Sequence, residues 1–207
     1  MYIDHQIYNT MELRDKYKAV LLAHKGDYYA FECVQNAQSA PFINCRFYVD
    51  LSTTTVSISG DIGSAVAVWG GNDTLHNIID YMRNPYYFIE KLRCSSDTWE
   101  YSEEDAKQEL TSAALDWNED GGEYIQDGRY IDDLDDIMSE FDETQGIRIL
   151  SDSQRDSAER LLGPDWGETI SSYGRSPHSR VLLWAKCFKF CVEELGLDTQ
   201  KILWVQV

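Results

Sequence analysis

Residues 42–69 read FINCRFYVDLSTTTVSISGDIGSAVAVW. Three runs within this stretch, at 42–49, 53–59 and 64–69, are rich in the aromatic and β-branched residues that are typical of strands. Short turns that contain Asp and Gly separate the runs. A further strand is expected at 27–35 (DYYAFECVQ). The first part of the chain therefore predicts an antiparallel meander of three or four strands.

Helical periodicity dominates most of the remaining chain. Before the meander, residues 11–24 place apolar side chains at helical spacing, and Gly26 is expected to end this helix. After Gly70 and Gly71 we expect six helices: from Asn72 or Asp73 to Met82, from Pro85, at 103–117 after the cap Ser102, at 129–141, at 152–162 after the Ser151/Gln154 capping box, and from Ser176-Pro177 to Leu195. The tail KILWVQV is expected to return to the sheet as a strand.

These elements predict an α+β fold, in which an antiparallel sheet packs against helices and an acidic helical lobe extends from residue 97 to 143. We expect one domain over 1–207. Residues 1–71 and 198–207 would form its sheet-rich part, and 72–197 its helical part. The hydrophobic fraction of 43% is sufficient for a packed core.

Composition excludes several classes of function. No apolar run reaches the ~20 residues that span a bilayer, and the N-terminus lacks the pattern of a signal peptide. The five cysteines form no CxxC pair, which favours reduced thiols in a cytosolic protein. The sequence has no basic patch of the kind that binds nucleic acid directly. It also has no zinc, phosphate-loop or nucleophile-elbow motif. We therefore expect no cofactor and no membrane association.

Negative charge is concentrated in one segment. Between Asp97 and Glu143 the chain has eighteen Asp and Glu residues against Lys107 and Arg129, which amounts to −16 of the formal net charge of −18. Such a block attracts cations or basic protein surfaces. The residues that we expect to contact a partner are Asp116, Glu119, Asp120, Glu123, Asp127, Asp132, Asp133, Asp135, Asp136 and Glu140.

The expected helix at 129–141 has one apolar face and one acidic face. Asp132, Asp136 and Glu140 follow each other at four-residue spacing, and no Lys or Arg stands at a position that would offset them. Like charges at this spacing cost a few tenths of a kcal/mol each, so folding alone does not favour the pattern. One interpretation is that this acidic face is only exposed to solvent. A more specific interpretation is that its carboxylates imitate nucleic-acid phosphates in the basic groove of another protein.

A metal site is an alternative interpretation of the same segment. Asp116, Asn118, Asp120 and Gly121 match positions 1, 3, 5 and 6 of an EF-hand loop that would end at Asp127. Position 12 is then Asp instead of the usual bidentate Glu, and Glu123 stands where an apolar residue belongs. A second alternative is a hydrolase whose carboxylates come together only in the folded chain.

Two stretches carry a resemblance to known proteins: SISGDIGSAVAVW at 57–69 and NPYYFIEKLRC at 84–94. They resemble a loose group of uncharacterised proteins of bacteriophages and mobile elements. Small acidic proteins of this kind include inhibitors of host defence, among them anti-CRISPR proteins. The resemblance implies a non-catalytic inhibitor in the host cytosol that presents carboxylates to the basic groove of a nucleic-acid-binding defence protein, such as a CRISPR–Cas effector.

Overall fold

The computed structural model describes residues 13–36, 43–118 and 128–197. Its contacts divide the chain into two compact units. Unit 1 consists of Met1–Thr98 and Pro177–Val207, and unit 2 consists of Trp99–Ser176. The sequence led us to expect one domain whose helical part begins at residue 72. The observed division instead keeps the first helices after the meander and the last helix with the sheet, and it joins most of the acidic lobe to residues 144–176.

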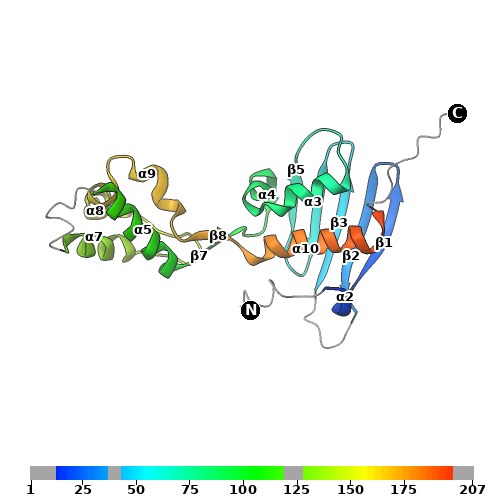
Figure 1. The fold of residues 1–207 in the computed structure, drawn as a ribbon, viewed down its shortest axis with the longest axis horizontal. Coiled ribbons are helices and arrows are strands. Elements are labelled where there is room, and N and C mark those ends of the chain that lie inside the picture. Colours follow the sequence, from blue (N-terminus) through cyan, green and yellow to red (C-terminus); the bar gives the residue numbers. More distant parts are fainter. Residues whose placement is uncertain (1–12, 37–42, 119–127, 198–207) are drawn as a thin grey trace. The chain divides into compact units, whose positions relative to one another are not determined.

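Unit 1 is built on a six-stranded antiparallel sheet in which strands that are adjacent in sequence are adjacent in space (Figure 1). The predicted meander and the α+β fold class are confirmed. In β3 and β4 buried residues alternate with more exposed ones, as expected for a sheet with one covered face. The strands are β1 (Tyr17–Lys25), β2 (Tyr28–Gln35), β3 (Asn44–Asp50), β4 (Thr55–Gly60), β5 (Ala65–Val68) and β6 (Leu92–Ser95).

Our prediction of a helix over residues 11–24 is wrong. A short helix, α2 (Leu13–Lys16), is followed directly by β1. In β1, Val20 lies opposite Glu32 of β2, so its backbone groups bond to a neighbouring strand instead of to the next helical turn. Leu21 and Leu22 are each 43% exposed, so the apolar residues at helical spacing do not form a buried stripe. Strand pairing, which is a tertiary effect, outweighed the local pattern.

Three helices cover one face of this sheet: α10 (Ser179–Glu194), α3 (Leu75–Arg83) and α4 (Pro85–Lys91). Figure 1 shows α10 lying across the sheet, and α10 contacts β1, β2 and β3. Phe31 and Phe47 of the sheet pack against Phe188 of α10, with ring centroids 5.3–5.5 Å apart. All three side chains are fully buried, and each contributes roughly 1.5–3 kcal/mol through burial. This aromatic cluster is the centre of the core of unit 1.

The helix starts of unit 1 agree only in part with the sequence analysis. Asn84 caps α4 and Pro85 is its first residue, as predicted. The N-cap of α3 is Thr74 and not the predicted Asn72 or Asp73. The Asp73 carboxylate accepts hydrogen bonds from the Thr74 N–H and, at 2.6 Å, from the Tyr81 hydroxyl. The last helix begins at Ser179 and not at Ser176-Pro177, which belong to a short strand, β8 (Arg175–Pro177).

Unit 2 packs three helices around a separate core, with β8 pairing with β7 (Trp99–Tyr101) beside them. The helices are α5 (Glu103–Trp117), α7 (Arg129–Met138) and α8 (Asp152–Leu162), followed by the short α9 (Trp166–Thr169) and a 3-10 turn, η1 (Ile170–Ser172). The predicted cap Ser102 and the capping box of Ser151 with Gln154 are confirmed. The buried apolar residues of this core are Ala106, Leu110, Ala114, Leu134, Ile137, Met138, Ile147, Ala158, Leu161 and Ile170.

Two further predictions concerned membrane-spanning helices and a strand at the C-terminal end. None of the helices described here has the length and apolarity needed to cross a bilayer. The strand predicted for the tail at 201–207 lies outside the described residues.

Candidate functional site

The formal charge of the chain is concentrated in unit 2. Its 78 residues hold 22 of the 36 Asp and Glu residues but only 6 of the 18 Lys and Arg residues. Unit 2 therefore has a formal net charge of −16, whereas unit 1 has −2. A folded unit with this charge produces a field that attracts basic surfaces and repels anions. We call the exposed carboxylates of α5 and α7, together with Glu140, the acidic surface: Glu103, Glu104, Asp105, Glu109, Asp116, Asp132, Asp135 and Glu140.

Helix α5 supplies five of these carboxylates, and its sequence explains their positions. The Ser102 hydroxyl accepts a hydrogen bond from the Asp105 N–H at 3.2 Å and starts the helix. Glu103, Glu104 and Asp105 occupy the first turn, where negative side chains are stabilised by the positive end of the helix dipole. Ala106 and Leu110 face the core and fix which side of the helix faces water. The acidic start of α5 is thus compatible with helix stability.

Helix α7 carries carboxylates in two different environments. Leu134, Ile137 and Met138 are buried, as the predicted apolar face requires. Asp132 and Asp135 are exposed, which also agrees with the prediction. Asp133 does not, because it is only 8% exposed. The acidic face of the predicted helix is therefore divided between solvent and the interior.

Asp133 is the centre of an interior polar network. Its two carboxylate oxygens accept hydrogen bonds from the Arg160 guanidinium of α8, with the Nε–Oδ2 pair at 3.0 Å. The Ser157 hydroxyl also donates to Asp133, at 2.9 Å. A buried carboxylate needs such partners, because removal from water without them costs several kcal/mol. Asp133 thus joins α7 to α8 instead of facing solvent, and its contact with a partner protein stays an untested prediction.

The predicted row of three evenly spaced carboxylates is interrupted. Asp136 is half-buried and accepts a hydrogen bond from the Ser153 hydroxyl at 3.1 Å. It also lies 2.9 Å from the Ser157 hydroxyl, whose single proton it shares with Asp133. Glu140 is exposed but lies beyond α7, which ends at Met138. Of the row, only Asp132 and Glu140 face solvent fully, and neither has a hydrogen bond or an ion pair among the described residues.

Asp135 has a basic partner that local spacing did not reveal. The Lys107 ammonium of α5 lies 3.0 Å from the Asp135 carboxylate. Both side chains are more than half exposed, so the pair contributes about 0–1 kcal/mol. Asp135 remains accessible to a stronger basic competitor.

The loop that matches an EF-hand motif lies mostly outside the described residues. Asp116 is exposed in the last turn of α5, and the side-chain amide of Asn118 donates to the Ala114 carbonyl at 2.8 Å as a C-cap. The helices α5 and α7 end and begin where the motif requires, at Trp117 and Arg129. Among the described residues no group of three or more His, Cys, Asp or Glu side chains is arranged to hold a metal ion. Calcium or magnesium binding stays a prediction, and its remaining ligands, Asp120 and Asp127, lie outside the described residues. Glu119 and Glu123, which we expected to contact a partner, lie outside them as well.

Asp142 follows α7 and organises a turn. Its carboxylate accepts hydrogen bonds from the side chain of Thr144, from the Thr144 N–H at 2.7 Å and from the Gln145 N–H at 3.0 Å. These hydrogen bonds, first of all that of the Thr144 hydroxyl, lower the pKa of Asp142 below its usual value. The group is thus held in its charged form, although its role is local structure.

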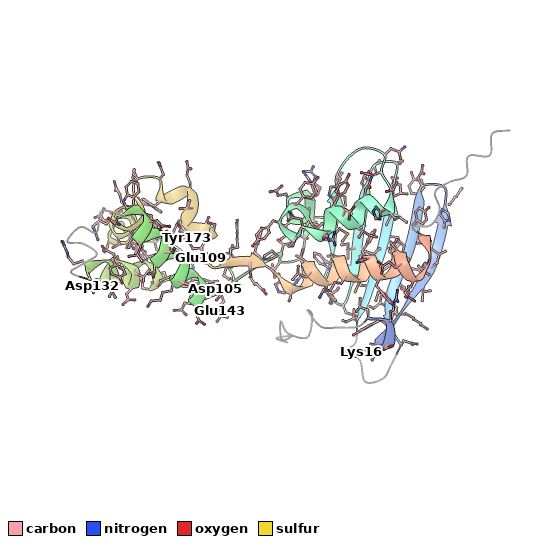
Figure 2. The ribbon with its side chains drawn as sticks, viewed as in Figure 1. Lys16, Asp105, Glu109, Asp132, Glu143 and Tyr173 are labelled. Atoms are coloured by element: carbon pink, nitrogen blue, oxygen red, sulfur yellow. The ribbon has the colours of Figure 1, made fainter. Side chains whose placement is uncertain are left out.

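The acidic side chains of unit 2 do not form a single compact patch. Figure 2 shows Asp132 at one end of unit 2, and Asp105 and Glu143 toward the other end. Our prediction missed the carboxylates at the start of α5, although the Ser102 cap followed by three acids is a recognisable helix start. It also missed the exposed carboxylates of α8 and of the segment after it: Asp152, Asp156, Glu159, Asp165 and Glu168.

One groove of unit 2 bears on the hydrolase alternative. A groove of about 500 Å³ lies along α5, and Glu104 is the one acid among its lining residues. It is also lined by Lys107, Gln108 and Leu115. A carboxylate pair of the kind used by glycosidases is thus not present in this groove.

Comparisons with protein-family models, with curated proteins and with solved structures found no match for this chain. The charge and the geometry of unit 2 are therefore the basis for the function proposed below.

Proposed function

We propose that unit 2 is a docking module that binds the basic, nucleic-acid-binding groove of another protein and thereby prevents nucleic acid from binding there. In this proposal the chain is a non-catalytic inhibitor of a host defence protein, encoded by a phage or a mobile element, and a CRISPR–Cas effector is the first partner to test. One observation carries the proposal, namely the confinement of −16 of the −18 formal charges to one compact unit.

The charge spacing of unit 2 suits a groove for one nucleic-acid strand. Helix α5 has 15 residues and is about 22 Å long at ~1.5 Å per residue. One strand of duplex DNA carries about six or seven phosphates over that length. The acidic surface presents seven carboxylates on α5 and α7, which pack against each other. The match is in charge density, since the individual carboxylates need not coincide with phosphate positions.

The stability of unit 2 comes from its interior and not from its surface. Exposed carboxylates for which the described residues provide no partner, such as Asp132 and Glu140, add to the negative charge of unit 2, and self-repulsion of a large net charge lowers stability. The apolar core and the Asp133–Arg160 ion pair offset this cost by holding α7 and α8 together. A surface that costs stability and is kept on a rigid support is typical of a binding site.

A competition experiment tests this function. The full chain is added to a guide-loaded CRISPR–Cas effector, and binding of labelled target DNA is followed by fluorescence anisotropy. We expect the wild-type chain to displace DNA, and the effect to weaken with increasing salt because the attraction is electrostatic. The variant Asp116→Lys/Asp132→Lys/Glu140→Lys should lose at least tenfold in potency.

The matched control changes the same amount of charge in unit 1. Asp27, Glu90 and Asp97 are also exposed, and the triple Lys variant at these positions should keep most of the potency. Equal potency of the two triple variants, with both folded by circular dichroism, would contradict docking through unit 2. Undisturbed DNA binding at a large excess of the wild-type chain would remove this effector as the partner.

A further inference from the structure

Four of the five cysteines meet in the core of unit 1. Cys33 belongs to β2 and Cys45 to β3, while Cys187 and Cys191 are one helical turn apart on α10. All four are completely buried, whereas Cys94 on β6 is exposed. Nothing in their sequence spacing indicated this arrangement, which arises because α10 contacts β2 and β3.

The strand register explains why the four thiols fit together. Cys33 lies directly opposite Cys45, and the same row continues to Ala19 on β1 and Gly60 on β4. These small residues leave space above the sheet that the cysteines of α10 occupy. The cluster therefore has two thiols from the sheet and two from the helix, all within one dry region of the core.

The thiols of Cys33, Cys187 and Cys191 shift one another's pKa. Cys187 first of all, and Cys191, lower the pKa of Cys33, while the interaction with Cys33 raises the pKa of both helix cysteines. The thiolate is therefore favoured at Cys33 over Cys187 and Cys191, and the thiolate is the nucleophilic form of cysteine.

We propose that these four thiols form a buried oxidation site, in which a peroxide joins Cys33 to Cys187 or Cys191 by a disulfide bond. The bond would link β2 to α10, two elements that are distant in sequence and adjacent in the core. Such a link restricts the unfolded chain strongly, because it closes a long loop. Oxidation would therefore hold the last helix on the sheet.

The chemistry takes two steps and consumes one hydrogen peroxide. The Cys33 thiolate attacks one peroxide oxygen and the O–O bond breaks; the departing hydroxide takes up a proton, which leaves a sulfenic acid and water. The sulfur of Cys187 or Cys191 then attacks the Cys33 sulfur, the S–O bond breaks, and a second water leaves with the thiol proton. Two thiols are oxidised to one disulfide, and one peroxide is reduced to two waters.

Because the thiols are buried, the oxidant reaches them through transient local opening of the core. The exposed Cys94 is an internal reference, since it reacts without any opening. We therefore expect oxidation of the cluster to be slower than that of Cys94, and to accelerate at urea concentrations below the unfolding midpoint.

The experiment uses the full-length Cys94→Ser protein, which cannot form cross-links through the exposed thiol. The folded protein is treated with hydrogen peroxide, the remaining thiols are blocked with N-ethylmaleimide, and the digested peptides are analysed by mass spectrometry. We expect a peptide containing Cys33 to be linked to the α10 peptide, with the loss of two hydrogen atoms, and the link to disappear on reduction.

Two variants assign the bond. Cys45→Ser should retain the link and Cys33→Ser should lose it, with folding of each checked by circular dichroism. If a variant does not fold, the peptide linkage in the Cys94→Ser protein still decides the assignment. A Cys33–Cys45 link, or four thiols that all react with N-ethylmaleimide after denaturation while peroxide has oxidised Cys94 in the wild-type chain, would overturn the proposal.

Discussion

Asp133 of α7 and Arg160 of α8 form a two-point ion pair in which the carboxylate is almost fully buried and the guanidinium is half exposed. The pair links two helices that both contribute to the core of unit 2. Asp133 is the most deeply buried carboxylate of α7.

Removal of the Asp133 carboxylate should therefore destabilise unit 2. We expect Asp133→Ala to lower the free energy of unfolding by about 2–3 kcal/mol, somewhat less than for a fully buried pair because Arg160 can be solvated. Urea unfolding followed by circular dichroism measures this. Asp132→Ala is the matched control at the neighbouring exposed position, and it should change stability by no more than about 0.5 kcal/mol. Equal effects at the two positions would disagree with the assigned roles.

Neutralising exposed carboxylates that have no partner in the described part of the chain should stabilise the protein. We expect Asp132→Asn/Glu140→Gln to raise the midpoint of thermal unfolding by about 2–3 °C in low salt, because it removes like-charge repulsion. The gain should shrink in about 0.5 M salt, where the Debye length is only a few ångströms. Differential scanning calorimetry at both salt concentrations checks this. A lower midpoint for the variant in low salt would indicate that these carboxylates have stabilising partners.

Acid should weaken the turn that follows α7. The pKa of Asp142 is lower in the folded than in the unfolded chain, so its contribution to stability is present above the unfolded value of about 3.9 and is lost as the pH falls through the folded value. Between about pH 5 and pH 2 the wild-type chain should therefore lose more stability than Asp142→Asn. The difference between the two proteins isolates this group, because relief of charge repulsion affects both alike. Parallel curves over this range would be inconsistent with the hydrogen bonds of Asp142.

Gly174 should not tolerate a side chain. Its φ of +68° is unfavourable for other residues, and an added Cβ would lie 2.4 Å from the Ser102 carbonyl oxygen. We expect Gly174→Ala to destabilise unit 2 by about 1–3 kcal/mol, measured by urea unfolding. Gly167 has an ordinary φ and no atom within 4 Å of the added Cβ, so Gly167→Ala should be neutral or slightly stabilising. The prediction fails if both alanines are tolerated equally.

Local signals allowed much of the fold to be predicted from the sequence. The Ser102 cap, the Ser151/Gln154 capping box and the Asn84-Pro85 start each involve residues within one helical turn, so the sequence contains the whole interaction. The meander was predictable for the same reason, since its turns are short. Residues 11–24 were assigned incorrectly because their conformation depends on pairing with β2, which the local apolar spacing does not record.

The candidate site was predictable in its charge but not in its exposure. The acidic block is a matter of composition, and the structure places it in one unit. Asp132 and Asp133 are indistinguishable in the sequence, yet one faces water and the other faces Arg160, which is 27 residues further along the chain. The four-cysteine cluster was also not predictable from the sequence, because it assembles from three elements that meet only after folding. Contacts between distant segments decide such details.

Unit 2 is a continuous segment inserted between two parts of the chain that together build unit 1. The two junctions are neighbours, because the His178 N–H donates to the Thr98 carbonyl at 2.8 Å and the adjoining residues continue as the paired strands β7 and β8. An insertion whose two ends leave the host side by side can be exchanged, lengthened or deleted without interrupting the sheet. Substitutions within unit 2 can therefore be made without changing the strands or helices that build unit 1.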